Sequence, residues 1–139
     1  MIVSAHSLLL DSEALSAAAQ DQRVMQPWLE LARQSDLVLY VSAATLAEVT
    51  DGSARDALVR RIVKAMRVVP VTAEIGYSSG GLRHVAATTR RKARDLTVDA
   101  IVAATAVMLP PPTIVLTSDP DDLRLLLQDT QVRVEGLNP

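Results

Sequence analysis

The stretch SLLLDSEALSAAA, residues 7–19, contains three consecutive leucines, an aspartate and then a segment rich in alanine. A short, continuous apolar run is typical of a strand that is buried on both faces of a sheet. Residues 12–19 favour a helix instead, because Ala and Leu have high helix propensities. Asp11 therefore lies where a buried strand gives way to a helix. Because ligands of open parallel sheets bind beside the carboxyl ends of the strands, Asp11 is a candidate functional residue.

The rest of the chain alternates short apolar runs with segments that have helical spacing. Further strands are predicted at residues 37–41, 68–71, 113–117 and 131–135. Helices are predicted at residues 12–19, 27–33, 43–49, 54–66, 96–108 and 119–128, with one more that follows Thr72 and runs towards Gly80-Gly81. The strand at 68–71 contains Pro70, which cannot donate a ladder hydrogen bond, so we expect it at an edge. This order predicts a three-layer α/β sandwich, a mainly parallel sheet of four to five strands flanked by helices, with residues 1–139 as a single domain.

The composition excludes several classes of function. The chain has no cysteine, which excludes a disulfide scaffold, a thiolate zinc site and a cysteine nucleophile. Aromatic residues make up only 2% of the chain, which argues against a platform that stacks single-stranded bases. No apolar run approaches the roughly 18 residues of a transmembrane helix, so we expect a cytoplasmic protein with no membrane partner.

The net charge of −2 hides a basic central region. Residues 55–94 contain ten basic and two acidic residues, whereas the remainder of the chain contains four basic and fourteen acidic residues. Such a region is typical of a surface that contacts phosphates, although a solvated helix face is an equally good interpretation. The basic residues that directly precede Asp99, and are therefore candidates for RNA binding, are Arg90, Arg91, Lys92 and Arg94.

Four acidic residues have positions that suit a shared site. Asp11 and Asp119 each follow a predicted strand, Glu48 lies in the helix after the second strand, and Asp99 opens the most apolar helix. The carboxyl ends of parallel strands meet at one edge, so Asp11 and Asp119 would be neighbours if their strands are adjacent. Clustered carboxylates repel one another unless a cation offsets their charge, and Mg²⁺ or Mn²⁺ prefer oxygen ligands. Such an ion can activate a water that hydrolyses a phosphodiester bond.

Each acidic residue also has a structural interpretation. Asp11 directly precedes a predicted helix, and Asp119 opens one just before Pro120, so each could be an N-cap. Asp95 is as good a candidate as Asp99 for the cap of the next helix, and Glu48 could be a solvated helix residue. These alternatives stay open on the sequence alone.

Five segments resemble the PIN-domain nucleases, and in particular the VapC-type toxins of type II toxin–antitoxin systems. In chain order they are LLLDSEALSA, TLAEV, VPVTAEIGYSSGGL, VDAIVAATA and TIVLTSDPDDL. The most specific match is VDAIVAATA, in which an aspartate precedes a helix of small residues. The resemblance covers nearly the whole chain.

The resemblance implies a PIN-like fold and a Mg²⁺- or Mn²⁺-dependent endoribonuclease. The implied catalytic residues are Asp11, Glu48, Asp99 and Asp119, of which Asp11, Asp99 and Asp119 are the implied metal ligands. Supporting roles fall to Ser12, Thr117 and Asp122. The resemblance also implies an RNA substrate, a homodimer and a cognate VapB-type antitoxin that blocks the cleft.

Three features depart from the family pattern. Glu13 stands where a small polar residue is more usual, Leu123 replaces an aromatic residue, and residues 1–6 form a longer run before the first strand. None of these departures removes an acidic residue. The alternative function is a catalytically silent, PIN-like binding module that acts through its antitoxin in operator binding. A phospho-acceptor receiver domain is disfavoured, because the chain has no lysine after a late strand.

Overall fold

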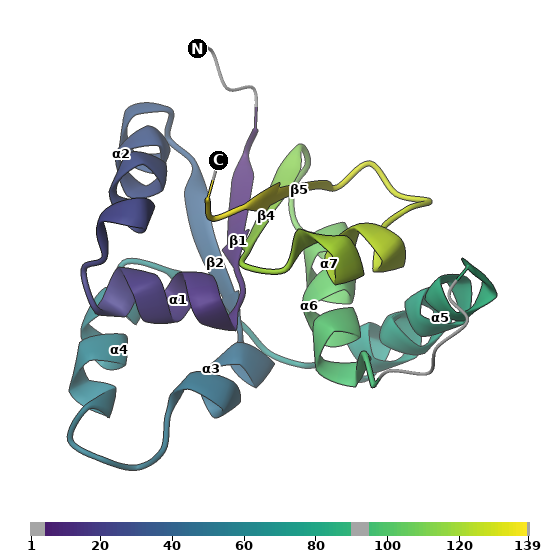
Figure 1. Ribbon diagram of the computed structural model, residues 1–139, viewed down its shortest axis with the longest axis horizontal. Coiled ribbons are helices and arrows are strands. Elements are labelled where there is room, and N and C mark those ends of the chain that lie inside the picture. The colour runs from purple at the N-terminus through teal and green to yellow at the C-terminus, as the bar shows by residue number, and fades with distance from the viewer. Residues whose placement is uncertain (1–4, 90–94, 139) are drawn as a thin grey trace.

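The computed structural model describes residues 5–89 and 95–138, and within them the chain forms one five-stranded sheet (Figure 1). All four strand pairs are parallel, and the strand order is β3-β2-β1-β4-β5. The strands are β1 (Ser7–Leu10), β2 (Val38–Ser42), β3 (Arg67–Val69), β4 (Thr113–Thr117) and β5 (Arg133–Gly136). The predicted parallel sheet is therefore confirmed, with β1 at its centre.

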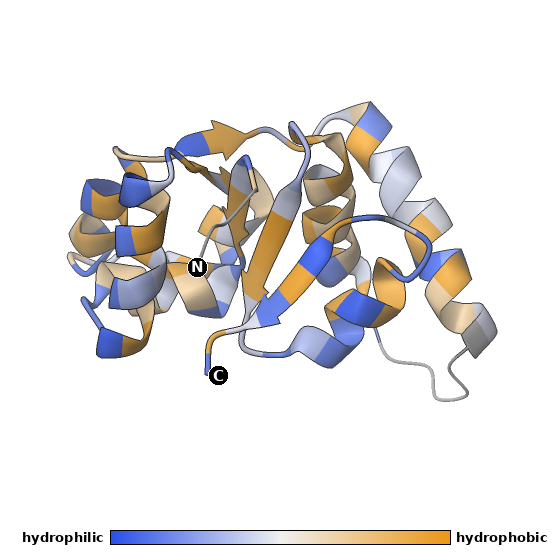
Figure 2. Ribbon diagram, turned by 90° about the horizontal axis from the view of Figure 1, so that it is seen from above, coloured by the Kyte–Doolittle hydropathy of each residue, from blue (hydrophilic) through white to orange (hydrophobic). Residues whose placement is uncertain are grey.

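Helices cover both faces of the sheet, so the molecule has three layers. On one side lie α1 (Ser12–Ala19), the short 3₁₀ helix η1 (Arg23–Met25), α2 (Gln26–Gln34), α3 (Ala43–Val49) and α4 (Asp56–Val63). On the other side lie α5 (Ala73–Thr89), α6 (Thr97–Met108) and α7 (Pro120–Leu126). Figure 2 shows that the strands in the middle of the sheet are mostly hydrophobic, whereas the helices beside them carry both hydrophobic and hydrophilic residues. The predicted three-layer α/β sandwich is confirmed.

The three leucines of β1 divide between two hydrophobic cores. Leu8 and Leu10 pack with α1, α2 and α4, whereas Leu9 packs with α6 and α7 on the opposite face. All three side chains are fully buried. Successive side chains of a strand point to opposite faces, which is why one apolar run contributes to both cores.

The element boundaries differ from the predicted ones by at most three residues where both ends were predicted. As expected, β3 lies at an edge of the sheet, and it ends just before Pro70. The larger difference is α5, which continues through Gly80-Gly81 to Thr89. Each glycine inside a helix costs about 1 kcal/mol relative to alanine. Packing of Leu82 and Ala86 into the second core outweighs that cost.

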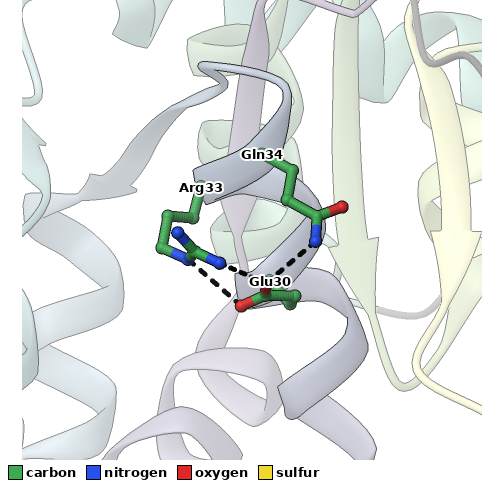
Figure 3. Close-up of polar contacts among 3 residues, drawn as sticks. All are labelled: Glu30, Arg33 and Gln34. Carbon is green, nitrogen blue, oxygen red and sulfur yellow. Dashed lines mark hydrogen bonds and ion pairs between the residues drawn. The ribbon is translucent and has the colours of Figure 1, made fainter.

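A polar group on α2 shows what an ordinary solvated helix face looks like in this protein (Figure 3). Arg33 and Gln34 both donate hydrogen bonds to the carboxylate of Glu30, and the Arg33 bond lowers the pKa of Glu30. Pairs at spacings of three and four stabilise a helix by a few tenths of a kcal/mol. Because α2 ends just before β2 begins, this group lies away from the carboxyl ends of the strands.

Among the described residues, no helix has both the length and the apolar character needed to cross a membrane.

Candidate active site at the carboxyl ends of the strands

The carboxyl ends of β1 and β4 are joined by hydrogen bonds around Asp11. The two strands pair in parallel, and the Asp11 amide donates to the carbonyl oxygen of Leu116 at 3.1 Å. The buried Thr117 hydroxyl bonds the Asp11 carboxylate and accepts a hydrogen bond from the Asp119 amide at 3.0 Å. The strand adjacency on which the predicted proximity of Asp11 and Asp119 depended is therefore present, and Thr117 links the Asp11 carboxylate to the backbone amide of Asp119.

Asp11 caps α1 and also lies at the carboxyl ends of β1 and β4. Its Oδ1 accepts a hydrogen bond from the Ala14 amide at 3.0 Å, so Asp11 is the N-cap of α1. A carboxylate has about four acceptor positions, and the cap uses one of them. Burial raises the pKa of Asp11 above its ordinary value, and the nearby charge of Glu13 adds to this shift. The hydrogen bonds from Thr117 and Ala14 act in the opposite direction. The ionised carboxylate is therefore costly to bury here.

Replacement of Asp11 by Asn is expected to raise the melting temperature of the metal-free protein at pH 7. Because the pKa of Asp11 is higher in the folded state, ionisation destabilises the folded protein as the pH rises through that pKa. Asparagine removes the charge and is an equally good N-cap. The advantage of the variant should shrink as the pH falls towards the ordinary aspartate value of 3.8. Thermal melts in EDTA at several pH values measure it, and an advantage that does not change with pH contradicts the assignment.

Glu48 is tied to the residue that follows Asp11. Ser42 ends β2 and caps α3 by accepting a hydrogen bond from the Ala44 amide at 3.1 Å, as predicted. Glu48 lies in the last turn of α3, where its side chain is exposed and accepts a hydrogen bond from the Ser12 hydroxyl. Glu48 is therefore exposed to solvent and also hydrogen-bonded to the start of α1, so both interpretations of Glu48 stay open. The Ser12–Glu48 hydrogen bond joins α1 to α3 next to Asp11.

The Asp95 carboxylate makes hydrogen bonds just before α6. The Asp95 carboxylate accepts from the Thr97 amide at 3.0 Å and from the Thr97 hydroxyl at 2.6 Å, which lowers the pKa of Asp95. Asp99 is half-buried in the first turn of α6. Because α6 packs against α3, the helices that carry Asp99 and Glu48 are neighbours at this end of the molecule (Figure 1).

The acidic residues around the start of α7 differ in exposure. Asp119 is exposed at the N-cap position, and its side chain makes no capping hydrogen bond. Asp122 is 5% exposed, which is unusual for an ionisable residue, whereas Asp121 is exposed. Leu123, at the position of the family's aromatic residue, is buried in the second core. The departure at Leu123 is therefore a change in core packing.

A polar cavity of about 300 Å³ adjoins Ser12 and Glu48, between α1, α3 and α4. Its lining includes Glu13, the residue that departs from the family pattern, and Arg55. The sequence analysis placed Arg55 in the basic region but did not connect it with the acidic residues. That connection depends on the chain returning through α4 beside α1, which no local pattern reveals.

The donor types suit a hard divalent cation, but the described residues do not form a compact ligand group. The candidate ligands offer only oxygen atoms, and a cation near Asp11 would offset the cost of burying its charge. Within residues 5–89 and 95–138, however, no three Asp, Glu, His or Cys side chains lie close enough together to hold a metal ion. The ligand assignment of Asp11, Asp99 and Asp119 stays a prediction. The predicted RNA-binding residues Arg90, Arg91, Lys92 and Arg94 lie outside the described residues.

Comparison of the structure with solved proteins gives consistent neighbours. VapBC2 from Rickettsia felis, bound to a promoter DNA fragment, contains a chain with a TM-score of 0.72 and 13% identity, covering 94% of this chain and 98% of that one. FitAcB from Neisseria gonorrhoeae contains a chain with a TM-score of 0.67 and 22% identity, and the match covers 94% of this chain and 97% of that one. DNA-bound VapBC from Salmonella typhimurium contains a chain with a TM-score of 0.71 and 15% identity, and the match covers 95% of this chain and 98% of that one.

No family model matches the sequence, and no curated protein matches it. The likeness is therefore one of fold, and it extends over nearly the full length of each chain. The likeness covers the sheet of five parallel strands and the helices on both of its faces. The chain therefore has the PIN-like α/β fold that it shares with these neighbours.

Proposed function

We propose that this protein is a metal-dependent endoribonuclease toxin of the VapC type, which hydrolyses RNA phosphodiester bonds. The observation that carries the proposal is the linkage of acidic residues at the carboxyl edge of the sheet. Thr117 connects Asp11 with Asp119, and Ser12 connects the start of α1 with Glu48. Asp99 begins the helix that packs against α3. The fold and its toxin–antitoxin neighbours support this proposal.

In the proposed site, Asp11, Asp99 and Asp119 would hold Mg²⁺ or Mn²⁺. When bound, such an ion supplies positive charge to a phosphoryl oxygen and lowers the pKa of an attacking water. Thr117 orients the Asp11 carboxylate, while the buried Asp122 supports the start of α7. The Ser12 hydroxyl orients Glu48, whose second carboxylate oxygen would accept a hydrogen bond from an attacking water. Arg55, across the neighbouring cavity, offers a cation to the RNA backbone.

Removal of the metal is expected to abolish RNA cleavage. Purified protein should cleave RNA in Mg²⁺ or Mn²⁺, lose that activity in EDTA, and regain it when excess Mn²⁺ is added, because the charge and the activated water depend on the ion. Cleavage is measured as the initial rate on a labelled RNA. A protein prepared in parallel with Asp11→Ala controls for contaminating nucleases. Strong cleavage that persists in EDTA, and that the variant retains, contradicts the proposal.

We also propose a homodimer in the cytoplasm, inhibited by a cognate VapB-type antitoxin. The support is that the structural neighbours are complexes of toxin with antitoxin. Light scattering of the purified chain tests the dimer, and a monomeric mass at micromolar concentration contradicts it.

A catalytically silent binding module is the second candidate, acting through its antitoxin in operator binding. One observation favours it: the described acidic residues do not form a three-ligand group. Titration calorimetry with Mn²⁺ separates the two candidates. Binding supports the nuclease, whereas a folded protein that takes up no Mn²⁺ supports the binding module.

A further inference from the structure

The cavity between α1, α3 and α4 lies directly beside the acidic edge of the sheet (Figure 1). Its lining includes both partners of the Ser12–Glu48 hydrogen bond, and Ser12 directly follows Asp11 in the chain. The volume of about 300 Å³ is at the lower end of the range for small-molecule sites, so it suits one compact group such as a nucleobase. A group bound here would lie next to the proposed cleavage site.

Three carboxylates of this cavity are already hydrogen-bonded within the protein. Glu48 accepts a hydrogen bond from the Ser12 hydroxyl. Asp56 accepts from two backbone amides, at 3.1 and 2.9 Å, and Asp51 accepts from the Ser53 amide at 2.9 Å. The bonds of Asp51 and Asp56 hold the loop between α3 and α4, so these two carboxylates have a structural role.

Glu13 and Arg55 are the charged side chains of the cavity that remain available to a ligand. Both are exposed, and neither side chain makes a hydrogen bond or an ion pair within residues 5–89 and 95–138. Glu13 is close enough to Asp11 for its charge to raise the pKa of that carboxyl, so Glu13 lies near the proposed cleavage site. Leu58, which is 41% exposed, adds an apolar wall. The cavity thus offers an acceptor, a cation and an apolar surface.

The opposite charges of Glu13 and Arg55 favour a nucleotide over a cationic side chain of a protein partner. Glu13 would attract such a side chain, but Arg55 on the same cavity would repel it. A nucleotide carries both N–H donors on its base and a negative phosphate, so it can satisfy both residues. Apolar side chains such as Leu58 can hold the face of a base, as they do in pockets for unstacked nucleotides.

Guanine is the base that fits the Glu13 carboxylate best. Its Watson–Crick edge presents two neighbouring donors, N1–H and N2–H, whereas adenine, cytosine and uracil each present only one donor group there. A carboxylate can accept two parallel N–H hydrogen bonds, and such bonds to an ionised group are stronger than neutral ones.

We propose that the cavity between α1, α3 and α4 is a guanine subsite for the RNA substrate, in which Glu13 accepts hydrogen bonds from N1–H and N2–H of one guanine and Arg55 contacts the adjoining phosphate. This inference takes the RNA substrate from the proposed function and adds the base that is bound beside the cleaved bond. It also gives a role to Glu13, the residue that departs from the family pattern.

The first measurement is RNA binding in EDTA, which does not depend on cleavage. Short labelled uridine RNAs carry one guanosine, inosine or adenosine at the centre, and fluorescence anisotropy gives their affinities for the full chain. The guanosine RNA should bind about tenfold more tightly than the adenosine RNA, as is usual for a bidentate contact to a base. Inosine lacks the N2 amino group, so its RNA should have intermediate affinity. The second measurement maps cleavage of the same RNAs in Mn²⁺, which should occur next to the guanosine.

Glu13→Gln should abolish the preference for guanosine in both measurements, because an amide places a donor where guanine needs an acceptor. The preference is a ratio between RNAs, so a general effect of the lost charge on Asp11 or on RNA affinity does not change it. Glu30→Gln is the matched control. It makes the same change in charge on α2, away from the carboxyl ends of the strands, and should keep the preference (Figure 3).

Arg55→Ala separates the phosphate contact from the base contact. It should weaken the binding of all three RNAs by a similar factor and reduce the slope of the salt dependence by about one, because a phosphate contact carries no sequence information. The ratio between the guanosine and adenosine RNAs should stay the same. Loss of that ratio in Arg55→Ala contradicts the assignment of Arg55 to the phosphate.

Equal treatment of the guanosine and adenosine RNAs by the wild-type protein, in binding and in cleavage, overturns the inference. A guanosine preference that Glu13→Gln retains also overturns it, and a cationic side chain of a protein partner is then the better occupant of the cavity. Cleavage without any guanosine preference removes this inference and leaves the proposed function. Guanosine-selective binding without cleavage in Mn²⁺ removes the proposed nuclease and leaves the subsite. A protein that neither binds nor cleaves these RNAs contradicts both.

Discussion

Replacement of Asp99 by Asn is expected to reduce RNA cleavage about 10³-fold while the protein stays folded. The substitution keeps the size of the side chain and removes one negative charge from the proposed metal ligands. The stabilisation that a metal ion gives to a phosphoryl transition state is several kcal/mol, and each 1.36 kcal/mol corresponds to a tenfold change in rate. Initial rates at saturating Mn²⁺, together with Mn²⁺ affinity from calorimetry, measure the effect.

Asp95→Asn is the matched control for Asp99→Asn. The two residues lie four positions apart, but Asp95 accepts hydrogen bonds from Thr97 and so has a local structural role. Asparagine can retain the hydrogen bond from the Thr97 amide, so cleavage should stay within about twofold of wild type. Equal losses in the two variants would mean that charge near the start of α6 matters rather than Asp99 itself. Full activity in Asp99→Asn would remove Asp99 from the site.

The acidic residues show why capping and catalysis are difficult to separate on sequence alone. Both roles favour a carboxylate directly before a helix, because helix amides and metal ions each attract negative charge. In the structure Asp11 is a cap and also lies at the edge where β1 meets β4. The two interpretations of Asp11 are therefore compatible, whereas at α6 the local hydrogen bonds belong to Asp95.

Local patterns were sufficient for most of the fold. The apolar run of β1 predicted a strand that is buried on both faces, and Pro70 predicted an edge strand. Both predictions depend on neighbours in the sequence, so they can be made without tertiary information. The continuation of α5 through Gly80-Gly81 could not be predicted in this way, because it depends on packing against α6.

The contacts within the candidate site could not be predicted from the sequence either, because they join residues that are distant along the chain. The resemblance named Ser12 and Glu48, but their hydrogen bond joins residues 36 positions apart. Sequence patterns thus identified the acidic residues, whereas the groups that orient them required the fold.

Replacement of Leu9 by Ala is expected to destabilise the protein by about 2–5 kcal/mol, because a fully buried leucine leaves a cavity that the core only partly fills. Leu9 is the residue of β1 that reaches the second core, where it packs with Val115 and Leu126. For a domain of this size the loss corresponds to a fall in melting temperature of roughly 5–15 °C. Urea unfolding followed by circular dichroism measures the free energy directly.

Val107→Ala is the control, since Val107 is 44% exposed on α6 and its change should stay within about 0.5 kcal/mol. The comparison tests whether the central strand is held from both sides. If Leu9→Ala costs less than 1 kcal/mol, then α6 and α7 do not pack firmly on this face of the sheet. The positions of Asp99 and Asp119 depend on that packing, because these residues open α6 and precede α7. A large cost therefore supports the second core as the scaffold that positions Asp99 and Asp119, and it connects the first apolar run of the chain to two acidic residues of the candidate site that lie about 90 or more positions later.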